Sequence, residues 1–220
     1  MQLGHWTDGY RFRRIREQLQ TGDKLHRDEV AAIQADVVHP RSGELAAPAA
    51  AFLRRCPLAG AEQLATLLAA WNGSYAIDET APTFFEAFWT CWRRRVASVR
   101  FPKHWIEAAA ERSGSIARRL LLGELSEWFG DRSVERESEA LAWLHKELGD
   151  YGDSWRWGAV HTVQFPHPLA NENPRIERLL SPGPFPTAGG NGTVRAAGFF
   201  TTQPFVMTSG STYRLVVDMG

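Results

Sequence analysis

The sequence has few of the features that mark several protein classes. Its two cysteines, Cys56 and Cys91, are far apart and lack Cys-x-x-Cys spacing, so they support neither a disulfide framework nor a zinc site. We expect two ordinary thiols, buried or half-buried. No stretch approaches the roughly 18 consecutive apolar residues of a membrane span. The first residues also lack the basic-then-apolar order of a signal peptide, so the chain as written predicts a soluble protein without a targeting signal.

The chain also lacks a net charge. Its 25 Lys and Arg residues are balanced by 25 Asp and Glu residues over 220 positions, so no global field would draw it to nucleic acid or to an anionic membrane. We therefore expect neither as a partner. Tryptophan, by contrast, is abundant, with nine residues. Large aromatic side chains are first of all core material, and six of the nine are predicted to pack among helices: Trp71, Trp89, Trp92, Trp105, Trp128 and Trp143.

Residues 1–150 are predicted to be mainly helical, because apolar residues recur there at helical spacing between short polar or Gly/Pro interruptions. Asp8 is a plausible N-cap for the first helix, and Asn72-Gly73 is a strong turn signal. The longest helix should begin at Thr80 and tolerate Pro82 in its first turn. The expected helices cover residues 8–20, a segment with Val30, Ile33 and Val37 that stops before Pro40, 64–71, 80 to just before Pro102, 116–129 and 134–148.

Residues 151–220 are predicted to be rich in β-structure. Seven prolines from residue 166 to residue 204 interrupt any helix, and strands are predicted over 158–165, 193–201 and 212–219. The Pro/Gly-rich run 181–192 is expected to be a long surface loop. The sequence therefore predicts an α+β protein, helical in its first part and β-rich in its second.

The last predicted strand bears on the extent of the protein. Residues 213–217 are apolar on both faces, so a strand there needs cover from both sides. Left at a free terminus, it would be an exposed edge that favours aggregation. We therefore expect the natural protein to have more chain, upstream, downstream or both, and the β-rich part to be truncated here.

Several short motifs follow one another in a fixed order. They are Tyr10-Arg11-x-x-Arg14-Ile15; Asp28, Ile33, Gln34 and Asp36; Leu68, Trp71, Asn72 and Gly73; Thr80-Ala81-Pro82-Thr83 with Glu86; Trp155, Trp157, Gly158, His161, Phe165, His167, Pro168 and Leu169; Gly189-Gly190-Asn191-Gly192-Thr193-Val194; and Tyr213-Arg214-Leu215-Val216-Val217-Asp218. The series resembles the later part of the beta-chain of penicillin acylases, which are N-terminal-nucleophile hydrolases. It covers nearly the whole of this chain.

The resemblance implies a heterodimer cut from one precursor, with a four-layer αββα core. This chain would hold a helical subdomain followed by strands of that core, incomplete here. The implied reaction is hydrolysis of linear amides, with beta-lactam side chains or acyl-homoserine lactones as substrates. An N-terminal serine attacks the amide, and backbone N–H groups and an asparagine amide stabilise the oxyanion. Both the serine and that asparagine would lie upstream, so the chain alone is expected to be inactive.

One residue of this chain takes a site role from the resemblance. Arg11 matches the arginine that lies near the nucleophile and helps to hold the catalytic hydrogen bonds, and a fixed guanidinium can orient a carbonyl or an amide. The alternative for Arg11 is a solvated helix face. The resemblance also implies the alpha-chain and the start of the beta-chain as partners and a periplasmic or secreted location. Calcium is possible in the full-length protein, but no cofactor or metal ligand is assigned in this chain.

Two other functional classes stay open. His161 and His167 could be ligands of a metal hydrolase, although no third ligand with suitable spacing is evident and structural histidines are the simpler interpretation. A non-catalytic helical interaction module, derived from an acylase, is the other alternative. Internal serines that follow glycine do not replace the missing nucleophile, because none precedes the Asn-x-Trp of the family motif: Ser74, Ser115 and Ser211.

Overall fold

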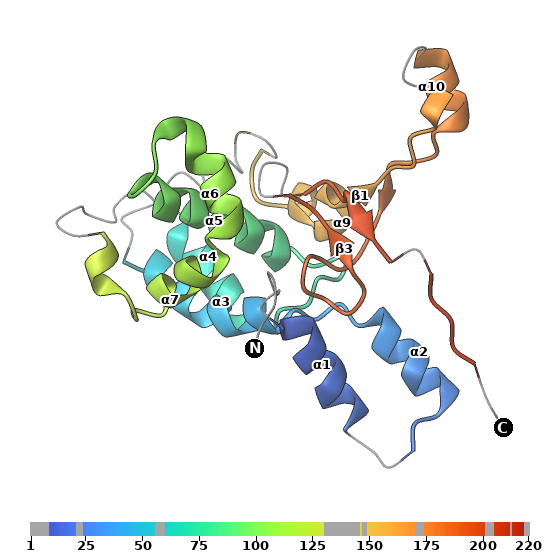
Figure 1. Ribbon diagram of the computed structural model, residues 1–220, viewed down its shortest axis with the longest axis horizontal. Coiled ribbons are helices and arrows are strands. Elements are labelled where there is room, and N and C mark those ends of the chain that lie inside the picture. The colour runs from blue at the N-terminus through green and yellow to red at the C-terminus, as the bar shows by residue number, and fades with distance from the viewer. Residues whose placement is uncertain are drawn as a thin grey trace, which may run out of the picture.

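A group of packed helices forms the body of the molecule, and a smaller part with short strands lies beside it (Figure 1). The computed structural model describes residues 9–20, 24–55, 60–129, 146, 149–169, 174–200, 205–211 and 213–217. The helices are α1 Tyr10–Leu19, α2 Arg27–Ala35, α3 Pro40–Leu53, α4 Ala61–Ala70, α5 Ala81–Ser98, α6 Ile106–Arg112, α7 Gly114–Leu121, α9 Trp157–Val160 and α10 Pro174–Leu180. The described strands are β1 Thr162–Val163, β2 Phe185–Pro186, β3 Ala197–Gly198 and β4 Ser209–Gly210.

The strands are short and pair antiparallel. β1 pairs with β2, and β3 pairs with β4, so the described residues hold two separate two-stranded sheets. Helix α10 stands away from the rest of the molecule on the two segments that lead to and from it (Figure 1). This mixture of helices with a few antiparallel strands agrees with the predicted α+β class.

The core is centred on α5, which packs against α3, α4, α6 and α7. Its aromatic side chains meet those of neighbouring helices: the ring of Trp92 lies 5.4 Å from that of Phe52, and Phe85 lies 5.3 Å from Trp71. Trp89 stacks on Phe85 within the same helix. Such pairs contribute stability beyond the area that they bury. The prediction that tryptophans form the helical core is confirmed for Trp71, Trp89 and Trp92.

Two of the remaining predictions on single residues have clear outcomes. Trp105 is 56% exposed, so its assignment to the core is wrong; it lies in a short 3-10 turn, Lys103–Trp105, at the surface. Cys91 is half-buried, as expected. Trp143 and Cys56 lie outside the described residues. None of the described helices is both long enough and apolar enough to cross a membrane.

The helix predictions were most accurate where proline or glycine residues mark a helix start or a turn. Helix α5 begins after Thr80 with Pro82 in its first turn, as predicted. Helix α4 is followed by the Asn72-Gly73 turn, where Gly73 has a φ of 85°. A side chain at Gly73 would meet the backbone oxygen of His39 at 2.7 Å, so both the backbone angle and the space require glycine. The first helix is confirmed in outline as α1, while its expected cap Asp8 lies outside the described residues.

Some helix boundaries were wrong for identifiable reasons. The helix with Val30 and Ile33 ends before Pro40, as predicted, but it already stops at Ala35, so Val37 lies outside it. Pro40 itself opens α3, since proline is well tolerated in a first helical turn. Helix α3 itself was not predicted, and neither was α6. The predicted helix over 116–129 ends at Leu121, because the chain turns at Gly123 with a φ of 77°. Of the helix expected over 134–148, the structure describes only residue 146.

The tail was predicted less well. The strand expected over 158–165 is reduced to β1, because Trp157–Val160 form the short helix α9. The strand expected over 193–201 is reduced to β3, because residues 193–195 form a bend. The run 181–192 is not only a surface loop. It contains strand β2, and its residues 187–190 are buried.

The last strand was also wrong in the part that is described. Residues 213–217 form no strand and pass beside α2 (Figure 1). Leu215 is 57% exposed, and its backbone oxygen accepts a hydrogen bond from Gln34 Nε2 at 3.0 Å. No neighbouring strand among the described residues pairs with this segment, and a single unpaired strand gains no ladder of backbone hydrogen bonds.

Trp157 joins the tail to the helical body. Its ring is fully buried and lies 5.2 Å from Tyr75 and 5.9 Å from Phe199. The indole N–H donates to the backbone oxygen of Gly189 at 3.0 Å, and the backbone N–H donates to Glu79 O at 2.7 Å. These bonds explain why the chain curls into α9 here: a buried tryptophan must satisfy its polar groups while its ring stays in the core.

A buried polar chain lies under α5. Ser42 Oγ donates to Tyr75 Oη at 2.8 Å, and Tyr75 Oη donates to a carboxylate oxygen of Glu86. All three side chains are almost fully buried. Burial raises the pKa of Glu86 and raises that of Tyr75 well above its usual value. The tyrosine hydroxyl is therefore the central partner of two buried polar groups.

We predict that Tyr75→Phe lowers the free energy of unfolding by about 1–3 kcal/mol, because it leaves a buried hydroxyl and a buried carboxyl without their partner. Urea denaturation measures the loss. Tyr151→Phe is the matched control, since Tyr151 is 39% exposed and its hydroxyl lies 3.0 Å from Thr80 Oγ1 at the surface. Its effect should stay within about 0.5 kcal/mol. Equal effects of the two substitutions would contradict the assignment.

His161 is buried among the aromatic side chains that surround Trp157. Its ring stacks on Trp157 at 4.4 Å, and Nδ1 lies 2.6 Å from the backbone oxygen of Phe205, to which it donates. Nε2 has no hydrogen-bond partner among the described residues. Burial lowers the pKa of His161 to about 4, although the bond to Phe205 opposes this. The folded protein therefore holds this imidazole neutral at pH 7.

This pKa predicts a loss of stability in acid. Above about pH 6.5 the imidazole is neutral in both states, so it has no effect on stability. As the pH falls from 6.5 to 4, the unfolded chain binds a proton that folded His161 refuses, and this destabilises the fold by up to about 3 kcal/mol. We expect His161→Phe to flatten the fall of unfolding free energy over this range. The exposed His104→Gln should leave the pH dependence as it is; a His161 variant with the wild-type pH dependence would refute the assignment.

Candidate functional site

Arg11 joins the two ends of the described chain. It lies in the first turn of α1, where its Nε donates to the backbone oxygen of Thr193 and its Nη2 to that of Asn191, both at 2.7 Å. The two bonds span 182 and 180 positions of sequence. Arg11 is exposed, as the alternative of a solvated helix face implies, but its guanidinium is also held by these two carbonyls. We call Arg11 and its two carbonyl partners, Asn191 and Thr193, the Arg11 clamp.

The clamp leaves part of the guanidinium uncommitted. An arginine side chain carries five N–H donors in one plane, and two of them bind the loop. The described residues offer Arg11 no other hydrogen-bond partner. One edge of the guanidinium is thus fixed to the backbone, and the other N–H groups are available to a carbonyl, a carboxylate or an amide.

The loop that receives Arg11 is itself braced. Thr193 is fully buried, and its hydroxyl accepts from Gly190 N at 2.9 Å and donates to Arg195 O at 2.6 Å. The side chain of Asn191 bonds both backbone groups of Phe199. Its Nδ2 donates to the Phe199 oxygen at 3.1 Å, and its Oδ1 accepts from the Phe199 N–H at 3.0 Å. Residues 189–194, predicted as the end of a surface loop and the start of a strand, instead form this braced turn.

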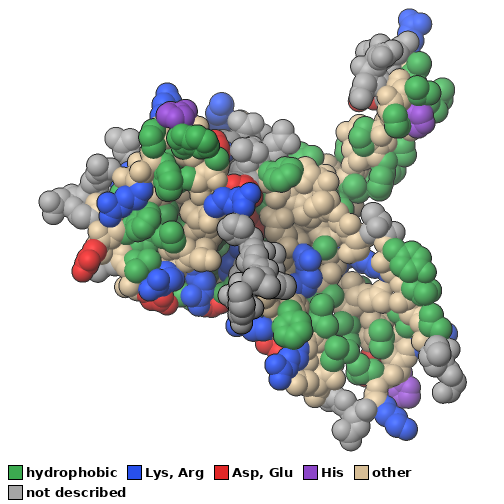
Figure 2. All heavy atoms as spheres, viewed as in Figure 1, with side chains coloured by type: hydrophobic (Ala, Val, Ile, Leu, Met, Phe, Trp, Pro, Cys, Tyr) green, Lys and Arg blue, Asp and Glu red, His purple; other side chains and the backbone are tan. Residues whose placement is uncertain are grey.

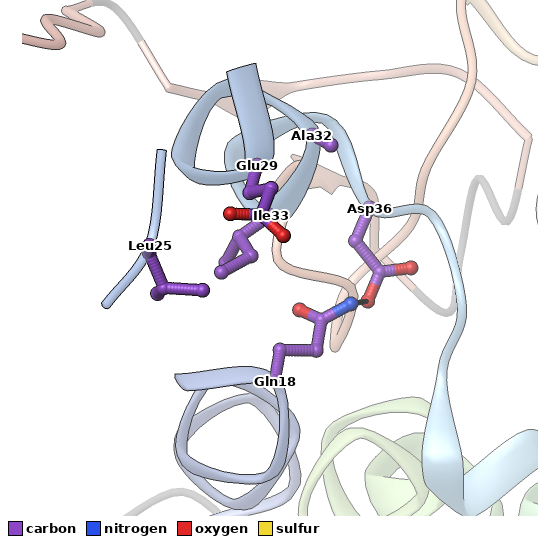
Figure 3. Close-up of a pocket in the computed structure, with 6 residues that line it drawn as sticks. All are labelled: Gln18, Leu25, Glu29, Ala32, Ile33 and Asp36. Atoms are coloured by element: carbon purple, nitrogen blue, oxygen red, sulfur yellow. Dashed lines mark hydrogen bonds between the residues drawn. The ribbon is translucent and has the colours of Figure 1, made fainter. Parts of the chain in front are cut away.

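A second set of contacts holds α1 against α2. Asp36 accepts hydrogen bonds from Arg14 at 2.6 Å and from Gln18 at 2.8 Å, both through one carboxylate oxygen. Its backbone oxygen accepts from Arg195 N at 2.8 Å. A cavity of about 350 Å³ lies beside these groups (Figure 3). The residues that line it are Gln18, Leu25, Glu29, Ala32, Ile33 and Asp36.

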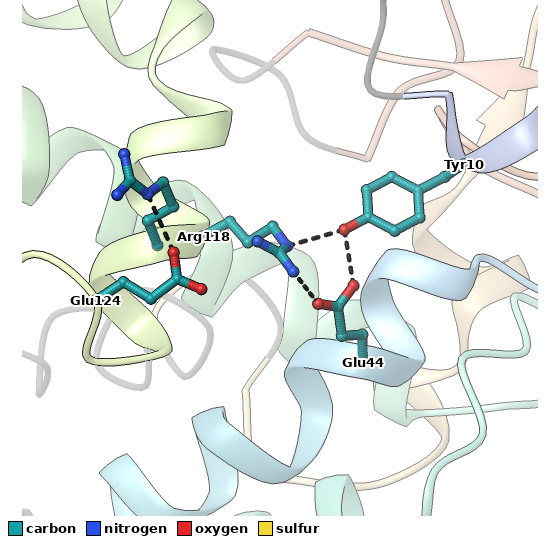
Figure 4. A network of polar contacts seen from close by, with 5 residues as sticks. Tyr10, Glu44, Arg118 and Glu124 are labelled. Carbon is teal, nitrogen blue, oxygen red and sulfur yellow. Dashed lines mark hydrogen bonds and ion pairs between the residues drawn. The ribbon is translucent and has the colours of Figure 1, made fainter.

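A polar network holds the start of α1 against α3 and α7 (Figure 4). Tyr10 Oη donates to Glu44 at 2.7 Å and accepts from Arg118 Nε at 2.9 Å, while Arg118 also pairs with Glu44. Arg13 lies over the Tyr10 ring. Because Tyr10 immediately precedes Arg11, this network fixes the helical turn from which Arg11 reaches the loop.

Behind the loop lies a charged cleft of about 340 Å³ between the helical body and the tail. His39 is enclosed beside it, and burial, together with the charges of Arg41 and Arg11, holds its pKa well below the usual value. Arg93 donates from Nε to Ala110 O at 2.7 Å. The residues that line the cleft are His39, Arg41, Glu86, Trp89, Thr90, Arg93, Glu111, Gly114, Asn191, Gly192 and Phe199.

The other sequence candidates do not assemble into a reaction centre among the described residues. Ser74 forms a bridge with Val38, Ser115 begins α7 and Ser211 follows β4; no imidazole or carboxylate of the described chain bonds their hydroxyls. His161 uses Nδ1 on Phe205, whereas His167 Nδ1 accepts from Leu169 N at 3.2 Å. Within the described ranges, no group of three or more His, Cys, Asp or Glu residues is placed to hold a metal ion.

Sequence reasoning found Arg11 but missed two of its neighbours. Asn191 was seen only as part of a turn, and its contact with the Arg11 guanidinium follows from a fold that brings distant segments together. His39 gave no signal at all, although a side chain at Gly192 would clash with its ring. The Gly-Gly-Asn-Gly pattern was the one signal of close backbone approach at this place.

Comparison with known proteins gives a consistent result. The family model described as "Penicillin amidase" matches residues 1–220. The chain is 30% identical over 225 residues to the penicillin acylase 2 proenzyme of Pseudomonas sp. (strain SE83). That match covers 96% of this chain and 28% of the relative, so the chain spans little more than a quarter of its length. The chain belongs to the penicillin amidase family.

Proposed function

We propose that this chain is part of an amidohydrolase that cleaves linear amides of small carboxylic acids, with Arg11 at its reaction site. The observation that carries the proposal is the Arg11 clamp: a guanidinium fixed along one edge by two backbone carbonyls, in a chain that matches the penicillin amidase family along its length. Penicillins, cephalosporin derivatives and acyl-homoserine lactones are the substrate types that we propose.

The proposed reaction is acyl transfer to a serine at the start of a processed chain. The hydroxyl attacks the amide carbonyl, the amine leaves, and water then releases the acid. Arg11 contributes by holding the catalytic hydrogen-bond partners in place with its uncommitted N–H groups, which are already oriented by the clamp. Such pre-orientation lowers the barrier because the geometry does not have to be organised during the reaction.

The serine nucleophile, the oxyanion asparagine and the acyl pocket would come from chain segments outside this sequence, in a helical subdomain joined to an αββα core. The share of the proenzyme relative that this chain covers, 28%, supports such partners. A periplasmic or secreted location belongs to the same proposal, as does calcium in the complete protein. The alternative, a non-catalytic helical module, predicts a folded protein that does not hydrolyse amides.

The test is Arg11→Ala in the full-length protein that contains this chain, assayed with chromogenic amides of small carboxylic acids. We expect kcat to fall about 10- to 100-fold, because one fixed donor set near the reacting groups is lost. Arg16→Ala is the matched control, since Arg16 is exposed on the same helix and should leave kcat unchanged.

Three results would overturn parts of the proposal. Unchanged turnover in a correctly folded Arg11 variant removes Arg11 from the site. A cooperatively folded full-length protein that hydrolyses none of the proposed amides supports the helical module instead. Activity that disappears on chelation and returns with zinc would favour a metal hydrolase.

A further inference from the structure

We propose that Asn191 is a positioning residue, which acts on the reaction through Arg11 without touching the substrate. The proposal rests on the proposed function of Arg11 and adds to it the part of the chain that holds the guanidinium in place. It concerns the side chain of Asn191, whereas the clamp itself uses only the backbone oxygen of that residue.

The first step is that the loop sets the plane of the guanidinium. Arg11 donates through two neighbouring nitrogens to two carbonyls that lie two residues apart, at 2.7 Å each. A planar fork held at two points cannot rotate about one bond, so the direction of the remaining N–H groups follows the direction of the two carbonyls. A shift or rotation of the peptide at Asn191 therefore becomes a shift of the Arg11 donors.

The second step is that the side chain of Asn191 fixes its own peptide to the aromatic core. The carboxamide bonds the N–H and the carbonyl of Phe199 at 3.0 Å and 3.1 Å, as a neighbouring strand would do. Phe199 is 6% exposed, and its ring lies 5.9 Å from Trp157 and 5.6 Å from His161. The loop is thus tied to side chains that cannot move without opening the core.

The third step is that the other loop contacts cannot replace this one. Thr193 ties its hydroxyl to Gly190 and Arg195, which braces the far side of the turn. Gly192 lies against the His39 ring, where it has no side chain to contribute a bond. In the described loop 189–193, only Asn191 connects the turn through its side chain to the strand region at Phe199.

A double-mutant cycle in the full-length protein tests the inference. We expect Asn191→Ala to lower kcat about tenfold with little change in KM, because Arg11 is misdirected while the substrate-binding surfaces remain. In the Arg11→Ala background, Asn191→Ala should have no further effect on kcat, because there is no longer a guanidinium to position. Residues that act through one another show such coupling, and independent residues do not.

A second readout does not depend on turnover. In the wild-type protein, the Arg11 Nε–H should exchange slowly in NMR spectra, because it is bonded to Thr193 O. Asn191→Ala should accelerate this exchange and leave that of the indole N–H of Trp157, which bonds Gly189 O, unchanged. Asn72→Ala is the control for loss of a loop asparagine: Asn72 caps its own turn by accepting from Ser74 N at 2.9 Å, and both readouts should match wild type.

Each outcome decides the matter. Multiplicative effects of the two substitutions on kcat would show that Asn191 has a separate structural role, and this overturns the inference. So does an Asn191 variant with wild-type kcat. If Arg11→Ala itself leaves kcat unchanged, the proposed function of Arg11 fails, and the inference fails with it. Should Asn191→Ala not fold, Asn191→Asp retains the acceptor for Phe199 N but loses the donor to Phe199 O, and the same cycle applies.

Discussion

The burial of Trp157 is the constraint on which the arrangement of the tail depends. An indole that is fully enclosed needs a partner for its N–H, and here the partner is the backbone of Gly189. The same residue bonds the turn before α5 through its backbone. One side chain therefore sets the position of the segment 187–190 relative to the helical body. The two-residue strands of the tail are too short to hold it in place alone, so its position depends on this junction together with contacts such as the Arg11 clamp.

A series of direct contacts connects Trp157 to Arg11. Phe199 packs on the indole, Asn191 binds the backbone of Phe199, and Arg11 binds the backbone of Asn191. On the helical side, the Tyr10–Glu44–Arg118 network fixes the turn that carries Arg11. Arg11 is thus held on two sides, by the network at the start of α1 and by the loop that accepts its hydrogen bonds.

Apolar side chains remain exposed elsewhere, over α10 and over the α1–α2 pair (Figure 2).

The sequence predicted what depends on local rules. Thr80 with Pro82 marked the start of α5, and Asn72-Gly73 marked the turn after α4, because capping and backbone freedom act within a few residues. It failed where distant contacts prevail. Residues 158–160 were predicted to begin a strand but belong to the short helix α9, which starts at the Trp157 that bonds Gly189. Arg11 could be named from its motif, whereas the carbonyls that hold it could not, because nothing near Arg11 in sequence indicates Asn191.

The great sequence separation within the Arg11 clamp has a consequence for biosynthesis. Contacts between residues 180 and 182 positions apart close late, since the intervening chain must first be ordered. A ribosome delivers Asn191 180 residues after Arg11, so the guanidinium has neither of its two carbonyl partners while the chain between them is made. Any step of maturation that requires an oriented Arg11 is therefore confined to the period after the tail has docked. Synthesis of residues 189–199 thus sets the earliest time at which Arg11 can be oriented.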